Sequence, residues 1–372
     1  MARAARYRAP LRAAAGIEAA AGVVALALAV VARLAAHLDH ALGLSGRTAV
    51  MAIAAALILG ATVLDLPFSA WRRAYERRWG FSRQTAAGWA ADHAKSLAVS
   101  LLLGAGVLVG AWSVIGATAL WWLWLWIACS ALSALLVMVA PALLAPLFNR
   151  FRELDDAQLA AATRQLGRRL GVEVRQVLVM DASRRTAKHN AYFTGLGRTK
   201  RVVLWDTLLA DCERPATLAV LAHELGHWRR HHVRWLLAIS SAVLLPGLLA
   251  LHLLLDGAGT HRLFGIAGAA DPAAIPMAAL AVVIGQAVWL PVAGWISRGF
   301  ERQADADAVG LIADAQPFVA MMHDLAVKNL SELAPSRAAY LLASHPPPAE
   351  RMALAAGMAT ADRMAARAPH ER

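Results

Sequence analysis

The sequence has few cysteines and few charges. Its 372 residues include only two cysteines, Cys129 and Cys212, which excludes a disulfide framework, and neither has the spacing of a metal site. No internal repeat and no Gly/Ser-rich linker is present. Charged residues make up 17% of the chain and are missing altogether from residues 96–149. A stretch of that length without charge is long enough for two membrane spans.

The formal net charge of +12 does not indicate a nucleic-acid partner. Basic residues are clustered beside apolar segments, where they orient a membrane protein, rather than spread over a polar domain. The expected partner is therefore the lipid bilayer, and no nucleic acid is expected.

Apolar residues dominate what is present. They make up 59% of the chain, and the mean hydropathy is +0.50, well above the usual range of soluble domains. Six membrane spans are expected, at residues 13–38, 48–68, two within 96–149 with a turn near Gly116, 235–255 and 272–297. Asp65, near the end of the second span, is expected to pair with an arginine.

The positive-inside rule predicts the orientation of these spans. Basic residues gather in the N-terminus, 71–95, 148–234 and 298–372, so both termini are expected in the cytoplasm of a multi-pass membrane protein. The Ala- and Arg-rich composition favours a bacterial inner membrane; a eukaryotic protein of this kind would lie in the ER membrane. Arg184, Arg185 and Lys188 are expected to form a solvated or lipid-facing charge run.

The polar middle of the chain predicts a small α+β region. An amphipathic helix is expected at 157–170 and strands at 174–180, 191–194 and 201–205. A helix over 217–232 follows, with the sequence TLAVLAHELGHWRRHH.

This helix contains an H-E-x-x-H motif formed by His223, Glu224 and His227. Residues four apart share one face of a helix, so both rings can reach a single zinc ion. Glu224 can reach a water on that ion rather than the ion itself, and a carboxylate there can take the proton of the water. A bare H-E-x-x-H also occurs by chance on exposed helices.

Two residues compete for the third ligand position. His231 is one turn further along, but the metzincin pattern requires Gly at 230 and His at 233, and this chain has Arg230 and Val233. We therefore expect His231 to lie at the membrane interface. The alternative is Glu301 with Asp305, four residues apart: one carboxylate can bind the metal while the other accepts the N–H of a ligand histidine.

The motifs divide the chain into four regions. Residues 1–150 hold four spans, and 151–232 the α+β region and the H-E-x-x-H helix. Two further spans occupy 233–297, and 298–372 form a C-terminal cytoplasmic region that carries the Glu301 helix.

Several motifs together resemble those of the type I CAAX prenyl endopeptidases, which are integral-membrane zinc metallopeptidases. Besides the H-E-x-x-H, the matching segments are 66–69 (LPFS), 76–85 (ERRWGFSRQT), 145–149 (APLFN), 190–193 (NAYF), 200–208 (KRVVLWDTL), 300–305 (FERQAD) and 344–351 (SHPPPAER). They cover most of residues 60–355 in the order of the family.

Together with the six expected spans, the resemblance implies a mostly α fold: a membrane helical barrel around a water-filled chamber, with a small cytoplasmic α+β, zincin-like region. The six spans are fewer than the seven usually drawn for eukaryotic members of the family. It implies one Zn²⁺ per chain, bound by His223, His227 and Glu301, with Asp305 holding a ligand histidine. At the other matching positions it implies that Glu224 is the general base, that His345 donates to the oxyanion, that Asn190 binds substrate backbone and that Arg351 braces this region.

Each of the last three residues has a structural alternative. Asn190 can be a turn residue, His345 can end a helix before three prolines, and Arg351 can pair with Glu350 or a phosphate.

Three functions remain open at this point. The first is a zinc endopeptidase acting at the cytoplasmic face on peptides or proteins, near the C-terminus of CAAX-like or prenylated substrates. The second is a metalloprotease that removes damaged membrane proteins, although the related heat-shock-induced proteases are shorter and lack the 66–85 motif. The third is a divalent-cation transporter, which leaves Glu224 unexplained.

Overall fold

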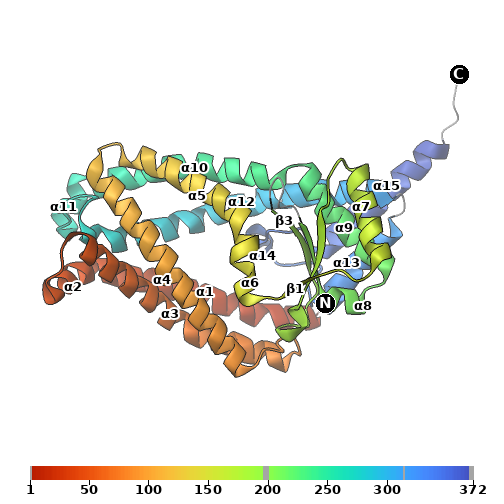
Figure 1. The fold of residues 1–372 in the computed structure, drawn as a ribbon, viewed down its shortest axis with the longest axis horizontal. Helices are drawn as coiled ribbons and strands as arrows, with labels where there is room; N and C mark the ends of the chain where they lie inside the picture. Colours follow the sequence, from red (N-terminus) through yellow and green to blue (C-terminus); the bar gives the residue numbers. More distant parts are fainter. Residues whose placement is uncertain (1, 196–200, 313–314, 368–372) are drawn as a thin grey trace, which may run out of the picture.

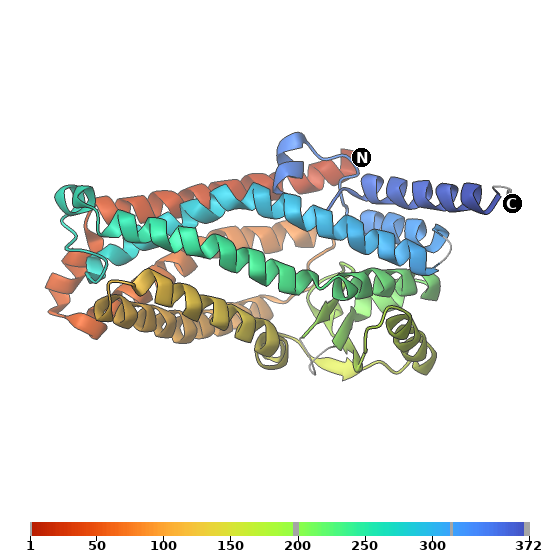
Figure 2. The same ribbon diagram turned by 90° about the horizontal axis from the view of Figure 1, so that it is seen from above.

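The computed structural model describes residues 2–195, 201–312 and 315–367; Lys200, part of the 200–208 motif, lies outside these ranges. The molecule is elongated (Figure 1). Long helices run side by side along one end, and a small sheet with shorter helices lies at the other (Figure 2). The fold is mostly α with a small sheet region, as predicted.

Within these described ranges, six helical segments are long and apolar enough to cross a membrane, in agreement with the predicted number. They are α1 (Ala2–Val31), α3 (Gly46–Arg78), α4 (Ala86–Ala117), α5 (Trp121–Leu143) with α6 (Ala145–Phe148), α10 (His232–Leu255), and η3 (Pro272–Ala274) with α12 (Ile275–Ile312). The short α2 (Leu34–Leu42) and α11 (Ala258–Phe264) lie between spans. The chain is a multi-pass membrane protein.

The first span differs from its predicted range of 13–38. Helix α1 begins at Ala2 and ends at Val31, and Arg33 then takes a left-handed conformation with φ 51° before α2. Two arginines in the first part of this helix make tertiary contacts: Arg8 donates to the carbonyl oxygens of Asn329 (3.0 Å) and Leu330 (3.1 Å), and Arg12 pairs with Glu332. A local hydropathy pattern contains no information about these partners.

Several charged residues next to the spans form ion pairs. Asp65 lies 3.5 Å from a guanidinium nitrogen of Arg72, the expected kind of partner. Of the predicted charge run, Arg184 is 52% exposed, as expected, but the other two residues are paired within the protein. Arg185 donates to both carboxylate oxygens of Asp92 at 3.0 and 2.9 Å, and Lys188 donates to Glu76 at 2.6 Å. These ion pairs attach the segment before β3 (Ala191–Thr194) to helices α3 and α4.

The sheet has four strands in the order β1-β2-β4-β3. Strands β2 (Gln176–Met180) and β4 (Arg201–Trp205) are parallel, whereas β1 (Phe151–Glu153) and β3 pair antiparallel to their neighbours. Three strands lie where the sequence predicts them; β1 is too short for a recognisable alternation. Strand β3 forms one edge of the sheet, and in its pairing Ala191 faces Leu204.

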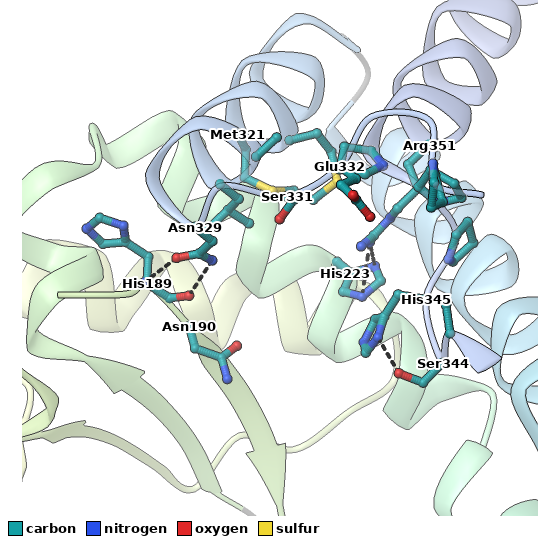
Figure 3. Close-up of a pocket in the computed structure, with 18 of the residues that line it drawn as sticks. His189, Asn190, His223, Met321, Asn329, Ser331, Glu332, Ser344, His345 and Arg351 are labelled. Atoms are coloured by element: carbon teal, nitrogen blue, oxygen red, sulfur yellow. Dashed lines mark hydrogen bonds between the residues drawn. The ribbon is translucent and has the colours of Figure 1, made fainter. Parts of the chain in front are cut away.

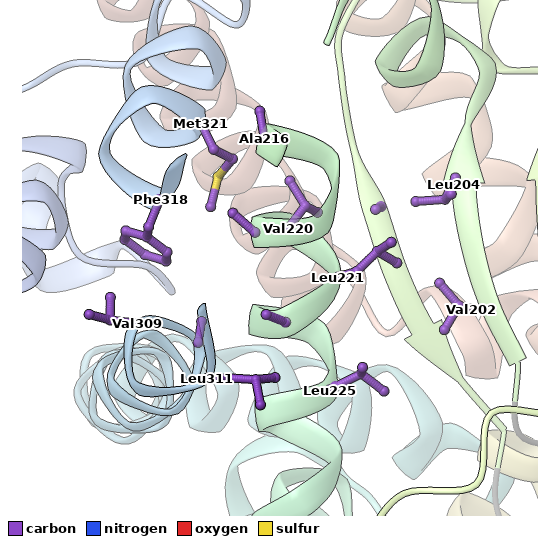
Figure 4. Packing of buried hydrophobic residues seen from close by; sticks show 14 of the residues in the cluster. Val202, Leu204, Ala216, Val220, Leu221, Leu225, Val309, Leu311, Phe318 and Met321 are labelled. Carbon is purple, nitrogen blue, oxygen red and sulfur yellow. The ribbon is translucent and has the colours of Figure 1, made fainter. Parts of the chain in front are cut away.

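Helix α9 (Arg214–Arg229) packs between this sheet and helices α12 and α13 (Gln316–Lys328) (Figure 4). Leu221 and Leu225 are completely buried against Val202 and Leu204 of β4, and Phe318 of α13 fills the opposite side of the core. The remaining elements of this region are η1 (Ala182–Arg184), α7 (Ala157–Arg169), α8 (Asp206–Asp211), α14 (Arg337–Leu342) and α15 (Pro348–Arg367).

Two helix boundaries position the site. Helix α9 ends at Arg229 rather than continuing to 232, because His231 adopts a left-handed conformation with φ 56° and α10 begins at His232. Helix α12, in contrast, continues without a break through the expected boundary at 297/298. The residues of the FERQAD motif therefore lie on the same rigid helix as the sixth span.

Candidate active site

The two histidines of the motif face α12 because the opposite side of α9 is apolar and packs on the sheet. Their Nε2 atoms lie 3.2 Å apart. Gly226 makes the approach of α12 possible: a Cβ at this position would lie 3.0 Å from the carbonyl oxygen of Ala304 and 3.1 Å from its Cα. A larger residue at 226 would push the two helices apart.

Glu301 of α12 completes a three-ligand cluster. One of its oxygens, Oε1, is 3.2 Å from Nε2 of His227, and the other, Oε2, is 3.4 Å from Nε2 of His223. The three ligand atoms all lie within 4.8 Å of one another. Within the described residues, Oε2 is buried without a hydrogen-bond partner. Two imidazoles and a carboxylate are a zinc ligand set that leaves a position for substrate, so these residues fit the metal.

Asp305 holds His223 from the opposite side. Its Oδ1 lies 2.8 Å from Nδ1 of His223, which leaves Nε2 of that ring facing Glu301. Arg351 donates to both oxygens of Asp305, at 2.8 and 2.6 Å. Glu350 pairs with Arg302 instead, which excludes the expected Arg351–Glu350 alternative.

The charges of this group are strongly coupled. Burial and the Arg351 guanidinium both act to lower the pKa of His223, but the nearby carboxylates of Asp305 and Glu301 outweigh them and raise this pKa to about 9. For Arg351, burial acts to lower the pKa, and the Asp305 carboxylate outweighs it and raises the pKa above its ordinary value. Because a proton and a metal ion compete for the same imidazole, metal affinity should fall as the pH falls.

His227 is held by two residues that the sequence analysis did not single out. Its Nδ1 lies 2.9 Å from Nδ1 of His232, whose Nε2 lies 3.0 Å from Oε1 of Gln303. His232 is five residues from His227, a separation that does not share a helix face. The two rings meet only because the left-handed residue His231 turns the chain between α9 and α10.

Glu224 is half-buried beside the ligand cluster and points toward the edge of the sheet. Its Oε2 accepts a hydrogen bond of 3.2 Å from the backbone N–H of Phe193 in β3. The carboxylate is absent from the three-ligand cluster, as expected for a residue that acts beside a metal.

A cavity of about 600 Å³ opens from this cluster (Figure 3). His223, Glu224, Asn190, His345 and Arg351 all line it. The other three predicted site residues, Asp305, His227 and Glu301, do not line the cavity, but each contacts His223, so the structure brings all the predicted site residues together. Apolar side chains from α9 and α13 line one part of the cavity, among them Val220, Met321, Met322 and Leu325, and polar residues such as Arg8, Arg12, Asn329 and Glu332 line another.

His345 lies on the loop between α14 and α15. Its Nε2 is 3.4 Å from Oε1 of Glu301, and its Nδ1 is 2.7 Å from the hydroxyl of Ser344. The side chain is 62% exposed, so it can reach a molecule in the cavity.

Asn190 is exposed at the start of β3, where its Oδ1 accepts the N–H of Ala191 at 2.9 Å. The residue before it, His189, is fixed on both sides of its peptide group: its N–H donates to Asn329 at 3.0 Å, and its carbonyl accepts from the Asn329 amide at 3.1 Å. This clamp, visible in Figure 3, was not predicted, because its two residues are 140 positions apart.

Comparison with family profiles places both parts of the chain. Residues 153–359 match the profile of peptidase family M48, and residues 4–150 match that of the CAAX prenyl protease N-terminal region, described as five membrane helices. In this chain, the N-terminal part that matches this second profile holds four of the six candidate spans.

Individual relatives agree with these matches. The chain is 31% identical over 305 residues to a CAAX prenyl protease 1 homolog of Arabidopsis thaliana, covering 78% of this chain and 69% of that protein. It is 31% identical over 278 residues to the metalloprotease YhfN of Bacillus subtilis, covering 74% and 65% respectively. The matched part therefore spans about two thirds of the length of these relatives.

The fold is similar to a solved structure as well. The crystal structure of S. mikatae Ste24p aligns with a TM-score of 0.76 at 27% identity, over 84% of this chain and 77% of that one. The chain is therefore a membrane-embedded member of peptidase family M48 that carries the N-terminal region of the CAAX prenyl proteases.

Proposed function

We propose that the protein is a membrane zinc endopeptidase that cleaves peptides or proteins at the cytoplasmic face, near the C-terminus of CAAX-like or prenylated substrates. The observation that carries this proposal is the convergence of His223, His227 and Glu301 beside Glu224, at the wall of a cavity large enough for a short peptide segment. The names of the relatives support the substrate class.

The ligand cluster would hold one zinc ion. Bound there, it would supply Lewis-acid polarisation of the scissile carbonyl and lower the pKa of water. Glu224 would take the proton from the attacking water and then deliver it to the leaving amine. Its position beside the cluster, rather than in it, suits this role.

Two further residues would bind the substrate, and a third would hold the ligand cluster in place. The exposed ring of His345 would donate a hydrogen bond to the oxyanion, a contribution of about 10²–10³ in rate for a single donor. Asn190, at the edge of the sheet, would hold the backbone of an extended peptide. Arg351 would keep Asp305 and His223 in place through its two hydrogen bonds to the carboxylate.

The lining of the cavity supports a CAAX-like substrate. Val220, Met321 and Leu325 offer an apolar surface beside Glu224, which suits the aliphatic residues that follow the cysteine of such a tail. The basic loops support our proposal that the site lies on the cytoplasmic side. A reporter fused after Leu255 should lie outside the cytoplasm and one at the C-terminus inside it; two reporters on one side would contradict this orientation.

The decisive experiment is cleavage of a peptide panel by the detergent-purified protein, with and without a zinc chelator. The panel contains a farnesylated CAAX peptide, the same peptide without lipid, its C-terminal amide and an unrelated membrane-protein peptide. Cleavage that a chelator abolishes and zinc restores is expected, with preference for the CAAX peptides. Equal cleavage of all four would favour removal of damaged membrane proteins, and no zinc-dependent cleavage would overturn the proposal.

A further inference from the structure

The two ligand histidines are held by different kinds of partner. His223 donates from Nδ1 to Asp305, a buried carboxylate paired with Arg351. His227 has no carboxylate at its Nδ1 among the described residues; its partner there is Nδ1 of His232. A contact of 2.9 Å between two imidazole nitrogens requires that one carries the hydrogen and the other accepts it.

Gln303 decides which ring donates. Its carbonyl oxygen, Oε1, can only accept, so at 3.0 Å it requires a hydrogen on Nε2 of His232. A neutral imidazole carries one N–H, so Nδ1 of His232 is then an acceptor, and the hydrogen between the two rings belongs to Nδ1 of His227. The Nε2 of His227 keeps its lone pair. If the Gln303 amide were turned over, its NH₂ would donate to Nε2 of His232. Nδ1 of His232 would then donate to Nδ1 of His227, and the hydrogen of the His227 ring would lie on its Nε2.

The ring of His232 is itself held in place. It is 2% exposed and stacks on Phe300 with a centroid distance of 4.3 Å and an interplanar angle of 9°. Phe300 and Gln303 lie on the same turn of α12, next to Glu301. Helix α12 therefore supplies the predicted metal ligand Glu301. It also supplies the two residues that orient His232, the partner of the second predicted ligand His227.

From this geometry we infer that His232 and Gln303 are positioning residues that fix the tautomer of His227, with its Nε2 lone pair toward Glu301 and His223. The inference rests on the proposed zinc site and extends it. A ring with the opposite tautomer would present an N–H to the metal and would have to exchange its proton before binding.

Zinc affinity measures this effect without reference to cleavage. The metal-free, detergent-purified protein is titrated with zinc in competition with a chromogenic chelator, for the wild type and four variants. His232→Phe keeps the stacking on Phe300 but removes both nitrogens, and affinity should fall about 10- to 100-fold, as for other groups that orient metal ligands. His232→Asn can offer a carbonyl acceptor near the position of Nδ1 and should recover much of that loss.

Two variants of Gln303 test the same inference, one as the test and one as its matched control. Gln303→Met removes the acceptor at nearly constant size, and Gln303→Glu keeps it. Gln303 is exposed, so both variants should fold even where His232→Phe does not. Weaker zinc binding in Gln303→Met but not in Gln303→Glu supports the inference. Equal affinity of the wild type, His232→Phe and Gln303→Met would overturn it, whereas a wild type that binds no zinc would instead overturn the proposed function.

Discussion

Helices α4 and α9 both carry many apolar residues, but they use them in different ways. Helix α9 buries ten of its 16 residues, between the sheet and α12, whereas none of the 32 residues of α4 is buried. Side chains of α4 such as Leu102, which is 77% exposed, face outward, where lipid takes the place of protein. A helix that faces lipid, such as α4, needs only apolar side chains. A helix packed between protein elements, such as α9 in the catalytic region at the sheet end of the molecule, also needs side chains whose shapes fit their neighbours.

Charged groups differ in the same way between the two regions. Asp65 and Arg72, on a span, are 39% and 44% exposed. Glu301 and Asp305 are 7% and 0% exposed and depend on neighbouring cations and imidazoles. Buried carboxylates are costly unless they are paired, so the catalytic region should tolerate far less change than the membrane region. The four predictions below test that difference.

The largest effect is expected from loss of the carboxylate ligand. Glu301→Ala should reduce bound zinc from one per chain to background and should abolish cleavage with it, because no other described carboxylate lies within the ligand cluster. Metal analysis of the purified protein measures this. His231→Gly is the control: His231 is not part of the ligand cluster, and glycine accepts its left-handed conformation, so this variant should keep full zinc. The reverse pattern would mean that the ligand set is wrong.

Glu224→Gln should lose cleavage but not zinc. Glutamine is nearly isosteric and leaves the ligand cluster intact, but it cannot accept a proton, which should lower kcat by about 10²–10⁴. Both zinc content and peptide cleavage are measured. Asp65→Asn, a similar change in the membrane region, should leave kcat close to that of the wild type. Near wild-type cleavage in a zinc-loaded Glu224→Gln protein would rule out the proposed base.

Truncation in the catalytic core should cost more stability than truncation on a span. Phe318 is completely buried, and Phe318→Ala should lower the free energy of unfolding by about 3–5 kcal/mol. Leu102→Ala, on the outer face of α4, should change it by less than about 0.5 kcal/mol. Unfolding in mixed detergent micelles compares the two. Similar losses for both variants would show that Leu102 has a protein neighbour rather than lipid.

The smallest effect is expected where the two regions meet. Arg185 and Asp92, both 21% exposed, form a two-hydrogen-bond ion pair between the segment before β3 and α4. A double-mutant cycle with alanine at both positions should give a coupling energy of about 0.5–3 kcal/mol. The exposed pair Arg152–Asp155 is the control and should show almost none. Equal coupling energies in both cycles would show that the Arg185–Asp92 pair contributes no more than an exposed surface ion pair.

Periodicity and hydropathy predicted most elements because their signals are local. The number of spans agrees with the prediction, and the strands at 191–194 and 201–205 and the H-E-x-x-H helix lie close to their expected positions. The errors occur where distant residues decide the outcome. Helix α1 begins before its predicted start, where Arg8 binds the carbonyls of residues 329 and 330, and Arg185 is paired with Asp92, which is 93 positions away in the sequence.

The sequence by itself determined the chemistry of this protein: two histidines and a glutamate at helical spacing, a carboxylate pair at 301 and 305, and enough apolar length to cross a membrane six times. Only the tertiary structure decided how that chemistry is held. Gly226 lets α12 approach α9, and the left-handed conformation of His231 brings His232 back to His227. Such contacts depend on the distance between helices and on the direction of a turn, which no spacing within a single helix encodes.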